Sequence, residues 1–225
     1  MMAKKTFHPK QFAMLNALSI FKILLLVVGG MALCGASGRF TSANGTLFKK
    51  RYTIESGSKM YLYGTTNVNN FTCHCEDQFG TRFVELESSG WKASYKDATL
   101  DLSVGGLNCR NRKIENDLRK ALKAEQYPNI RIKLLETIQN PDCIDGKCQG
   151  WFDIYAKMNL TITGVTRTRD IHARAKLLAP KKLQLVGEQT LYMTDFGITP
   201  PEAMLGMIRV NDQIDFHFDL IVTTD

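Results

Sequence analysis

Apolar side chains recur at every second position along most of the chain, and this spacing constrains the fold more than any other feature of the sequence. The longest such run extends from Phe152 to Ile162 and ends at Gly164, with polar residues between most of the apolar ones. Similar runs contain Leu62 and Phe216, which lie far from each other in the sequence. Successive side chains of a β-strand point to opposite faces, so each run predicts a strand with one buried face. We therefore expect a domain built mostly of strands.

One segment departs from this period and predicts a short helix. Its apolar positions have the spacing of one helical face: Ile114, Leu118, Ala121 and Leu122. Asn108 or Asn111 is expected to cap its start, and Tyr127 with Pro128 is expected to end it. Basic residues cover its outer face, which is more typical of a solvated surface than of a site for an anionic partner.

Long strands with one apolar face must bury that face, either between two packed sheets or inside a closed barrel. A single helix cannot cover a flat sheet of this size, and closure removes exposed strand edges. Hydrophobic residues make up 44% of the chain, which is enough for one substantial core. The sequence therefore predicts an all-β fold, an eight-stranded antiparallel β-barrel with one short α-helix inserted between strands.

The N-terminal segment has the pattern of a secretory signal peptide. Basic residues up to Lys22 precede an apolar run over residues 23–34, and small residues follow it. The run is shorter than the ~20 apolar residues that cross a bilayer, so a permanent anchor is the weaker interpretation. Cleavage after Ala36 or Ser37 would remove the signal peptide.

We accordingly predict a signal peptide over residues 1–37 and an exported domain over residues 38–225, in the periplasm or cell envelope. Lipid attachment at Cys34, as in bacterial lipoproteins, is the alternative. The bulky Leu33 before it stands where lipoprotein signals have a small residue, which disfavours that alternative.

The formal charge of +7 does not predict a nucleic-acid-binding protein. Four of the 29 basic residues are lysines before the apolar run. The remaining 25 nearly balance the 22 acidic residues, which is typical of an ordinary solvated surface. We therefore expect no nucleic-acid partner.

The five cysteines that follow the signal peptide suit an oxidising compartment, where disulfides are the default. Cys143 and Cys148 bracket an Asp-Gly pair typical of a tight hairpin turn, so their sulfurs are expected to face each other. Cys109 is then expected to pair with Cys73 or Cys75, which leaves one odd thiol.

A metal site formed by Cys73, His74 and Cys75 is the alternative for these residues. On a strand the two cysteines share one face while the histidine between them points to the other. The three side chains cannot converge on one ion without a bulge, so we expect disulfides and no metal.

The sequence lacks the motifs of common enzymes and cofactor sites, such as a G-x-S-x-G elbow or a phosphate-binding glycine loop. His74, His172 and His217 alternate with apolar neighbours, so each is expected to point outward. Asp195 follows a strand, where its carboxylate could act in a site or simply cap a turn. An enzyme would need Asp195 and a histidine to converge in one pocket. We expect neither catalysis nor a cofactor.

The inward apolar side chains allow two structures for the barrel interior. They could fill it completely, as in small closed barrels, or leave a cavity for an apolar ligand. Several inward positions carry small residues, which would leave room along the axis: Gly64, Gly106, Ala156, Ala173 and Ala175. The spacing alone does not choose between the two.

Four segments of the chain form a recognisable set. The first is residues 160–166 (LTITGVT), and the second is the end of the helix with Tyr127, Pro128 and Ile130. The third is the stretch 195–198 (DFGI), and the fourth is the closing segment 210–218. In sequence and in chain order, these segments resemble the YceI-like family of exported lipid-binding proteins. The resemblance covers roughly residues 58–224, nearly the whole domain. The five cysteines depart from the plainer family pattern and indicate a subgroup.

This resemblance implies a lipocalin-like barrel and a polyisoprenoid or similar apolar ligand, carried or sequestered inside it. It implies no catalytic residues. The expected lining is Leu62, Phe71, Leu102, Val104, Ile132, Met158, Leu160, Ile162, Ala173, Leu191, Met193, Phe216 and Phe218. A polar head of the ligand is expected at a mouth near Asp195 and the Gly164 turn.

A different class of function is a packed barrel that serves as a scaffold or interaction module of the cell envelope. It would bind a partner on its outer surface and no small molecule inside. Tyr61, Tyr63 and Tyr192 are the candidates for an exposed aromatic patch. Proximity to a membrane and a homodimer are compatible with either function.

Overall fold

The computed structural model describes residues 46–140, 143 and 148–224. The predicted signal peptide, Cys34 and the Asp-Gly turn between Cys143 and Cys148 lie outside the described residues. Among the described residues, no helix combines the length and the hydropathy needed to cross a membrane.

Strands make up most of the described chain, as the period of two predicts. The strands are β1 (Thr46–Ile54), β2 (Lys59–Thr66), β3 (Asn70–Cys75), β4 (Gly80–Ser88), β5 (Lys92–Ser103), β6 (Leu107–Asn108), β7 (Asn129–Gln139), β8 (Trp151–Ile162), β9 (Val165–Ala179), β10 (Lys182–Tyr192), β11 (Glu202–Ala203) and β12 (Ile208–Thr224). The α-helix is α1 (Arg112–Ala121), and two 3₁₀ turns are η1 (Val104–Gly106) and η3 (Met193–Phe196).

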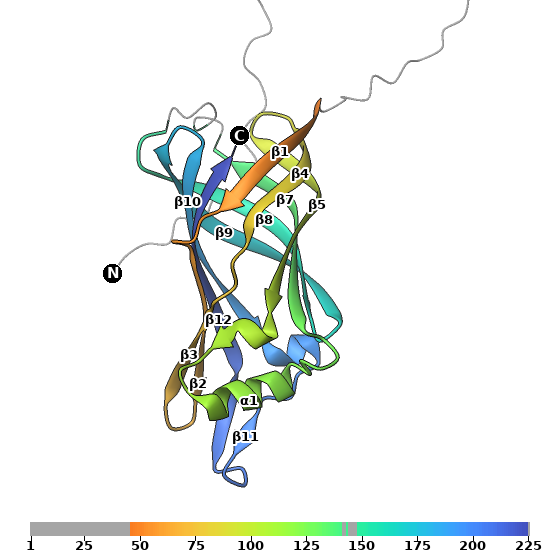
Figure 1. The fold of residues 1–225 in the computed structure, drawn as a ribbon, viewed down its shortest axis with the longest axis vertical. Coiled ribbons are helices and arrows are strands. Elements are labelled where there is room, and N and C mark those ends of the chain that lie inside the picture. The colour runs from red at the N-terminus through yellow and green to blue at the C-terminus, as the bar shows by residue number, and fades with distance from the viewer. Residues whose placement is uncertain (1–45, 141–142, 144–147, 225) are drawn as a thin grey trace, which may run out of the picture. The chain divides into compact units, whose positions relative to one another are not determined.

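The strands close into an eight-stranded antiparallel barrel, which confirms the predicted fold class. The ring runs β1-β4-β5-β7-β8-β9-β10-β12 and returns to β1 (Figure 1). The 17 residues of β12 make the closure, because its last residues pair with β1 and its earlier part pairs with β2. β2 continues into β3 and β6, which extend the wall at the end of the barrel that carries α1.

The helix begins where predicted but ends earlier. The side chain of Asn111 accepts hydrogen bonds from the backbone N–H groups of Lys113 and Ile114, so Asn111 is the cap. Ala121 is the last helical residue, and Lys123 adopts a positive φ of 49° that a continuing helix does not allow. The helix thus ends at the last residues of its apolar face, before Tyr127 and Pro128, which we expected to end it.

Two of the small residues expected to leave room along the axis, Gly64 and Gly106, do not leave it. A Cβ built on Gly64 would overlap the ring of Phe71, and one built on Gly106 would lie 2.5 Å from Oδ1 of Asp77. Larger neighbours fill the space beside these two glycines, in keeping with the close packing of protein interiors.

Two disulfides are present, and they select among the pairings left open by the sequence. Cys73 bonds to Cys109, and Cys143 bonds to Cys148. Cys75 is the free cysteine of the described residues. Burial, with the nearby Asp77 carboxylate, raises the pKa of the Cys75 thiol to about 11, so it stays protonated and unreactive near neutral pH.

Candidate functional site

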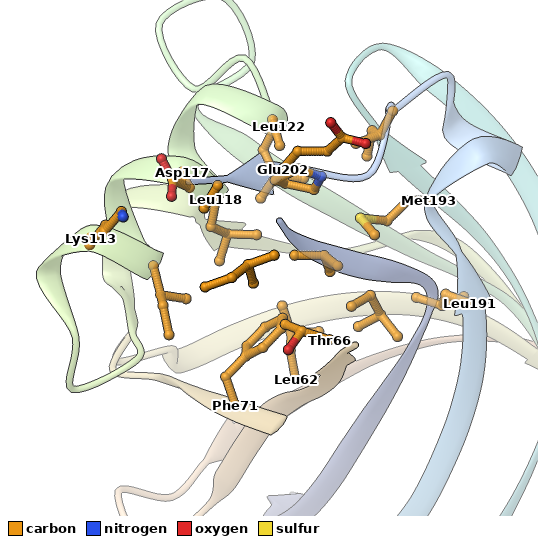
Figure 2. A pocket seen from close by; sticks show the side chains of 18 of the residues that line it. Leu62, Thr66, Phe71, Lys113, Asp117, Leu118, Leu122, Leu191, Met193 and Glu202 are labelled. Carbon is orange, nitrogen blue, oxygen red and sulfur yellow. The ribbon is translucent and has the colours of Figure 1, made fainter. Parts of the chain in front are cut away.

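An apolar cavity of about 250 Å³ opens at the end of the barrel that carries α1 (Figure 2). Its wall combines α1, the β2–β3 hairpin, η3 with the segment after it, and the start of β12. The apolar lining consists of Leu62, Phe71, Ile114, Leu118, Ala121, Leu122, Ile130, Ile162, Leu191, Met193, Phe196, Ile198, Pro201, Ala203, Ile208, Val210 and Ile214.

Polar side chains are few in this cavity, and the charged ones come from α1 and β11. They are Lys113 and Asp117 on the helix and Glu202 on the strand (Figure 2). Lys113 and Glu202 are exposed, which places them at the mouth. A cavity with an apolar wall and a charged mouth can hold an apolar group and leave a polar end in water.

The structure brings five of the predicted lining residues together in this cavity: Leu62, Phe71, Ile162, Leu191 and Met193. Met193 belongs to η3 rather than to the strand on which we expected it. Its flexible thioether side chain fills irregular space in the cavity wall.

The other predicted apolar positions do not line the cavity. Leu102, Val104 and Leu160 are buried in the core cluster, and Val104 begins η1 rather than continuing a strand. Ile132, Phe216 and Phe218 pack against this cluster. Met158 and Ala173 lie on β8 and β9 outside it.

β12 contributes to the cavity with its first half. Ile208, Val210 and Ile214 line it, whereas the next inward residues along the strand, Phe216 and Phe218, do not. The rings of these two phenylalanines lie 6.1 Å apart, centroid to centroid, and both pack against the core cluster.

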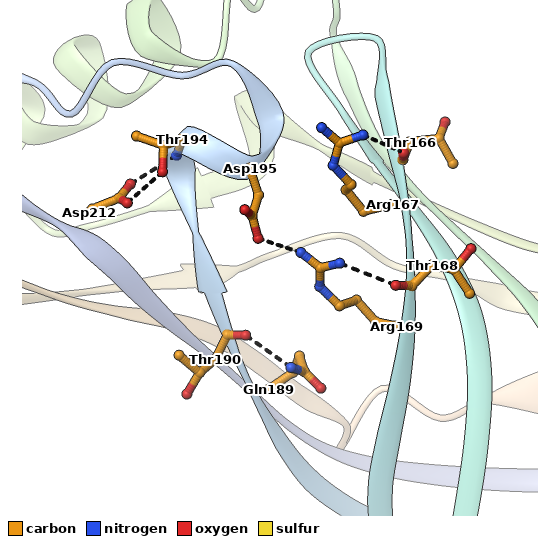
Figure 3. A network of polar contacts seen from close by, with 9 residues as sticks. All are labelled: Thr166, Arg167, Thr168, Arg169, Gln189, Thr190, Thr194, Asp195 and Asp212. Carbon is orange, nitrogen blue, oxygen red and sulfur yellow. Dashed lines mark hydrogen bonds and ion pairs between the residues drawn. The ribbon is translucent and has the colours of Figure 1, made fainter.

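Asp195, which we expect near a polar head group of the ligand, is not among the residues that line this cavity. Its carboxylate forms an ion pair with Arg169 on the barrel wall (Figure 3). Arg169 also lies over the ring of Phe196, which is buried and lines the cavity. Asp195 thus holds Arg169 and the cavity wall in place.

The four segments that carry the family resemblance meet around the cavity. The Thr163 hydroxyl donates a 2.6 Å hydrogen bond to the carbonyl oxygen of Phe196, which joins the first segment to the third. Gly164 of the first packs against the Tyr127 ring of the second. Asp212 of the fourth accepts hydrogen bonds from the backbone N–H and the hydroxyl of Thr194, at the start of η3 (Figure 3).

None of His74, His172 and His217 lines the cavity. Nε2 of His172 lies 2.7 Å from Oδ1 of Asp153. The His217 ring stacks on the Tyr61 ring, with centroids 4.7 Å apart. Asp195 forms no contact with any of them among the described interactions. The geometry needed for the enzymatic alternative is not formed by these residues.

The three tyrosines proposed for an outer aromatic patch differ in exposure. Tyr61 and Tyr63 are only partly exposed, whereas Tyr192 is 47% exposed and also lines the cavity. The three tyrosines therefore do not form the exposed aromatic patch expected of a partner-binding surface.

The alternation in the sequence does not predict the part of the wall that lies outside the barrel strands. The spacing of Ile114, Leu118 and Ala121 predicts a buried helical face, and the structure shows that this face lines the cavity. The residues around β11 carry no periodic pattern, so no spacing signal distinguishes them. The apolar face of the single helix is a signal for this end of the barrel. A helix that packs beside the mouth of a barrel turns its apolar face toward the interior.

A family model described as the YceI-like domain matches residues 32–222, which is most of the chain. The chain belongs to the YceI-like family. The predicted family is therefore confirmed, and the four resemblance segments are the frame of its cavity.

Solved structures agree with this YceI-like fold. A polyisoprenoid binding domain from Saccharophagus degradans, implicated in plant cell wall breakdown, is 11% identical, with a TM-score of 0.55 over 77% of this chain and 98% of its own. BcnA of Burkholderia cenocepacia is 12% identical, with a TM-score of 0.54 over 75% of this chain and 98% of its own. At such identities the likeness shows the fold alone. A comparison with curated proteins finds no match.

Proposed function

We propose that this chain is an exported binding protein that holds one end of a long apolar molecule, of the polyisoprenoid type, in the cavity beside α1. The observation that carries the proposal is the wall itself, in which apolar side chains predominate and charged ones stand at the mouth. The polyisoprenoid binding domain from Saccharophagus degradans, which shares the fold, supports this class of ligand.

Burial of apolar surface is sufficient to drive such binding. Each buried CH₂ group contributes about 0.8 kcal/mol, so one isoprene unit contributes about 4 kcal/mol before the costs of association. A cavity of about 250 Å³ is smaller than the ~300–1,000 Å³ pockets that enclose drug-sized ligands. A long chain is therefore held by one end, and its remainder extends through the mouth.

Export is supported by the pattern of the N-terminal segment and by the two disulfides. Disulfides persist in oxidising compartments and are rare in the cytosol. A carrier outside the cytoplasm would shield an apolar molecule that water does not dissolve.

A substitution in the helical wall tests the proposal. Leu118→Glu places a carboxylate against the ligand, whereas Asn116→Glu adds the same charge at an exposed position of the same helix. We expect Leu118→Glu to weaken binding of a fluorescent isoprenoid probe by at least about tenfold, because burial of an unpaired charge is costly. Asn116→Glu is expected to bind as the unaltered protein does.

Fluorescence titration measures both affinities, and circular dichroism verifies that both variants are folded. Equal affinities for the two variants would show that the probe does not occupy this cavity. Absence of binding to the unaltered protein would reject the proposed ligand class.

A further inference from the structure

Four apolar side chains project into solvent next to the cavity mouth. Met204 is 55%, Leu205 104% and Met207 64% exposed, all in the turn between β11 and β12. Val68, in the turn between β2 and β3, is 62% exposed. We call these four residues the apolar tip. Single exposed apolar residues are common, but four in two joined turns are not.

Hydrogen bonds through Asn67 join the two turns. Its side-chain amide donates to the carbonyl oxygen of Met207 at 2.9 Å, and its side-chain oxygen accepts from the backbone N–H of Arg209 at 2.9 Å. Its backbone N–H donates to the carbonyl oxygen of Arg209 at 3.1 Å. The tip is therefore one fixed surface rather than two independent loops.

The backbone of the tip does not favour the residues found there. Met204 and Leu205 have positive φ values of 50° and 56°, and the N–H of Gly206 donates to the carbonyl oxygen of Ala203. Such a hairpin turn is normally built from Asn, Asp and Gly, and bulky residues at positive φ are strained. Stability of the fold does not explain Met and Leu at these positions, whereas a contact made by their exposed side chains would.

The tip is continuous with the cavity. Glu202, Ala203 and Ile208, which flank its larger turn, line the cavity, as do Thr66 and Asn69 beside Val68. Figure 1 shows the β11–β12 hairpin projecting past α1 at this end of the barrel. An apolar molecule that entered between these residues would pass directly from the surface that the tip contacts into the cavity.

The size and charge of this region favour a lipid surface. A protein interface of ordinary size buries about 800 Å² on each partner, which a tip of two short turns cannot supply. Insertion into a bilayer has no such requirement, because each buried apolar side chain contributes independently. The neighbouring helix carries four basic and two acidic residues, whereas Arg209 beside the tip is paired with Glu202. The net positive charge of the helix suits anionic headgroups.

We propose that the apolar tip inserts into the surface of an anionic bilayer and holds the cavity mouth against it, so that the ligand is exchanged with the membrane. The exchange rests on the proposed function, whereas insertion of the tip does not.

Leu205→Asn tests the insertion. Asn tolerates the left-handed conformation, so we expect this variant to unfold at the same temperature as the unaltered protein or slightly higher. Its partitioning onto vesicles of phosphatidylethanolamine and phosphatidylglycerol is expected to fall about tenfold. Leu178→Asn is the matched control, because Leu178 is also exposed but lies near the end of β9 farthest from the Gly164 turn.

In a chain that retains its signal peptide, the apolar run over residues 23–34 would add affinity for lipid, so a second measurement locates the contact. A tryptophan introduced by Leu205→Trp is expected to be quenched by brominated lipids, and one introduced by Leu178→Trp is not. Unchanged partitioning of Leu205→Asn together with absence of quenching at position 205 would overturn the insertion.

These vesicle measurements need no ligand, so they separate the two proposals. Vesicle binding through the tip without isoprenoid binding would reject the proposed ligand and leave the insertion standing. Isoprenoid binding without tip insertion would reject the insertion and leave the proposed ligand standing.

Discussion

The interior of this barrel depends on pairs of one small and one large residue. Gly187 on β10 lies under the ring of Phe218, and Gly64 on β2 lies under the ring of Phe71. In each pair the ring occupies the space that a Cβ on the glycine would fill. The Phe71 ring lines the cavity, and the half-buried Phe218 ring packs against the core cluster.

Gly187→Ala is therefore expected to destabilise the fold. The added Cβ would overlap the Phe218 ring, and overpacking of a core costs about 1–3 kcal/mol. Gly57→Ala is the control, since its Cβ would meet only Ile221 at an ordinary 3.4 Å. Chemical denaturation measures both free energies of unfolding. Equal stabilities of the two variants would contradict this account of the interior.

The alternation in the sequence predicted which residues point inward but not how much space they leave. It identified Leu62 and Phe71 correctly as cavity residues, and it also suggested that Gly64 leaves room. Free volume depends on rotamers of neighbours on other strands, such as the Phe71 ring over Gly64. No spacing within one strand contains that information.

At the scale of elements, the segment from β3 to α1 sets the helical wall of the cavity. The Cys73–Cys109 bond ties β3 to the residues just before α1, and both cysteines are buried. Cys143–Cys148 instead closes a short loop between β7 and β8. The periodicity predicted the strands and the helix, whereas the choice of Cys73 over Cys75 required the fold.

The two disulfides are expected to contribute unequally to stability. Cross-linking removes more chain entropy when the closed loop is longer, about 4 kcal/mol at a separation of 36 residues and about 2 kcal/mol at a separation of 5. Replacing Cys73 and Cys109 by Ala should therefore lower the free energy of unfolding more than replacing Cys143 and Cys148. Denaturation curves of the two double variants compare them, and the reverse order would refute the expectation.

At the scale of the whole molecule, the barrel follows from the sequence but its open end does not. Long strands with one apolar face and a single helix predict closure, and the ring of eight strands confirms it. The position of the cavity depends on where α1 and η3 pack against the strands. These are contacts between residues far apart in sequence.

Native mass spectrometry of the protein purified from cells, followed by lipid extraction, tests the central claim most directly. We expect an adduct of one apolar molecule that organic extraction removes, present at much lower occupancy in Leu118→Glu. A wild-type protein that carries no such molecule and takes up no added isoprenoid would contradict the claim.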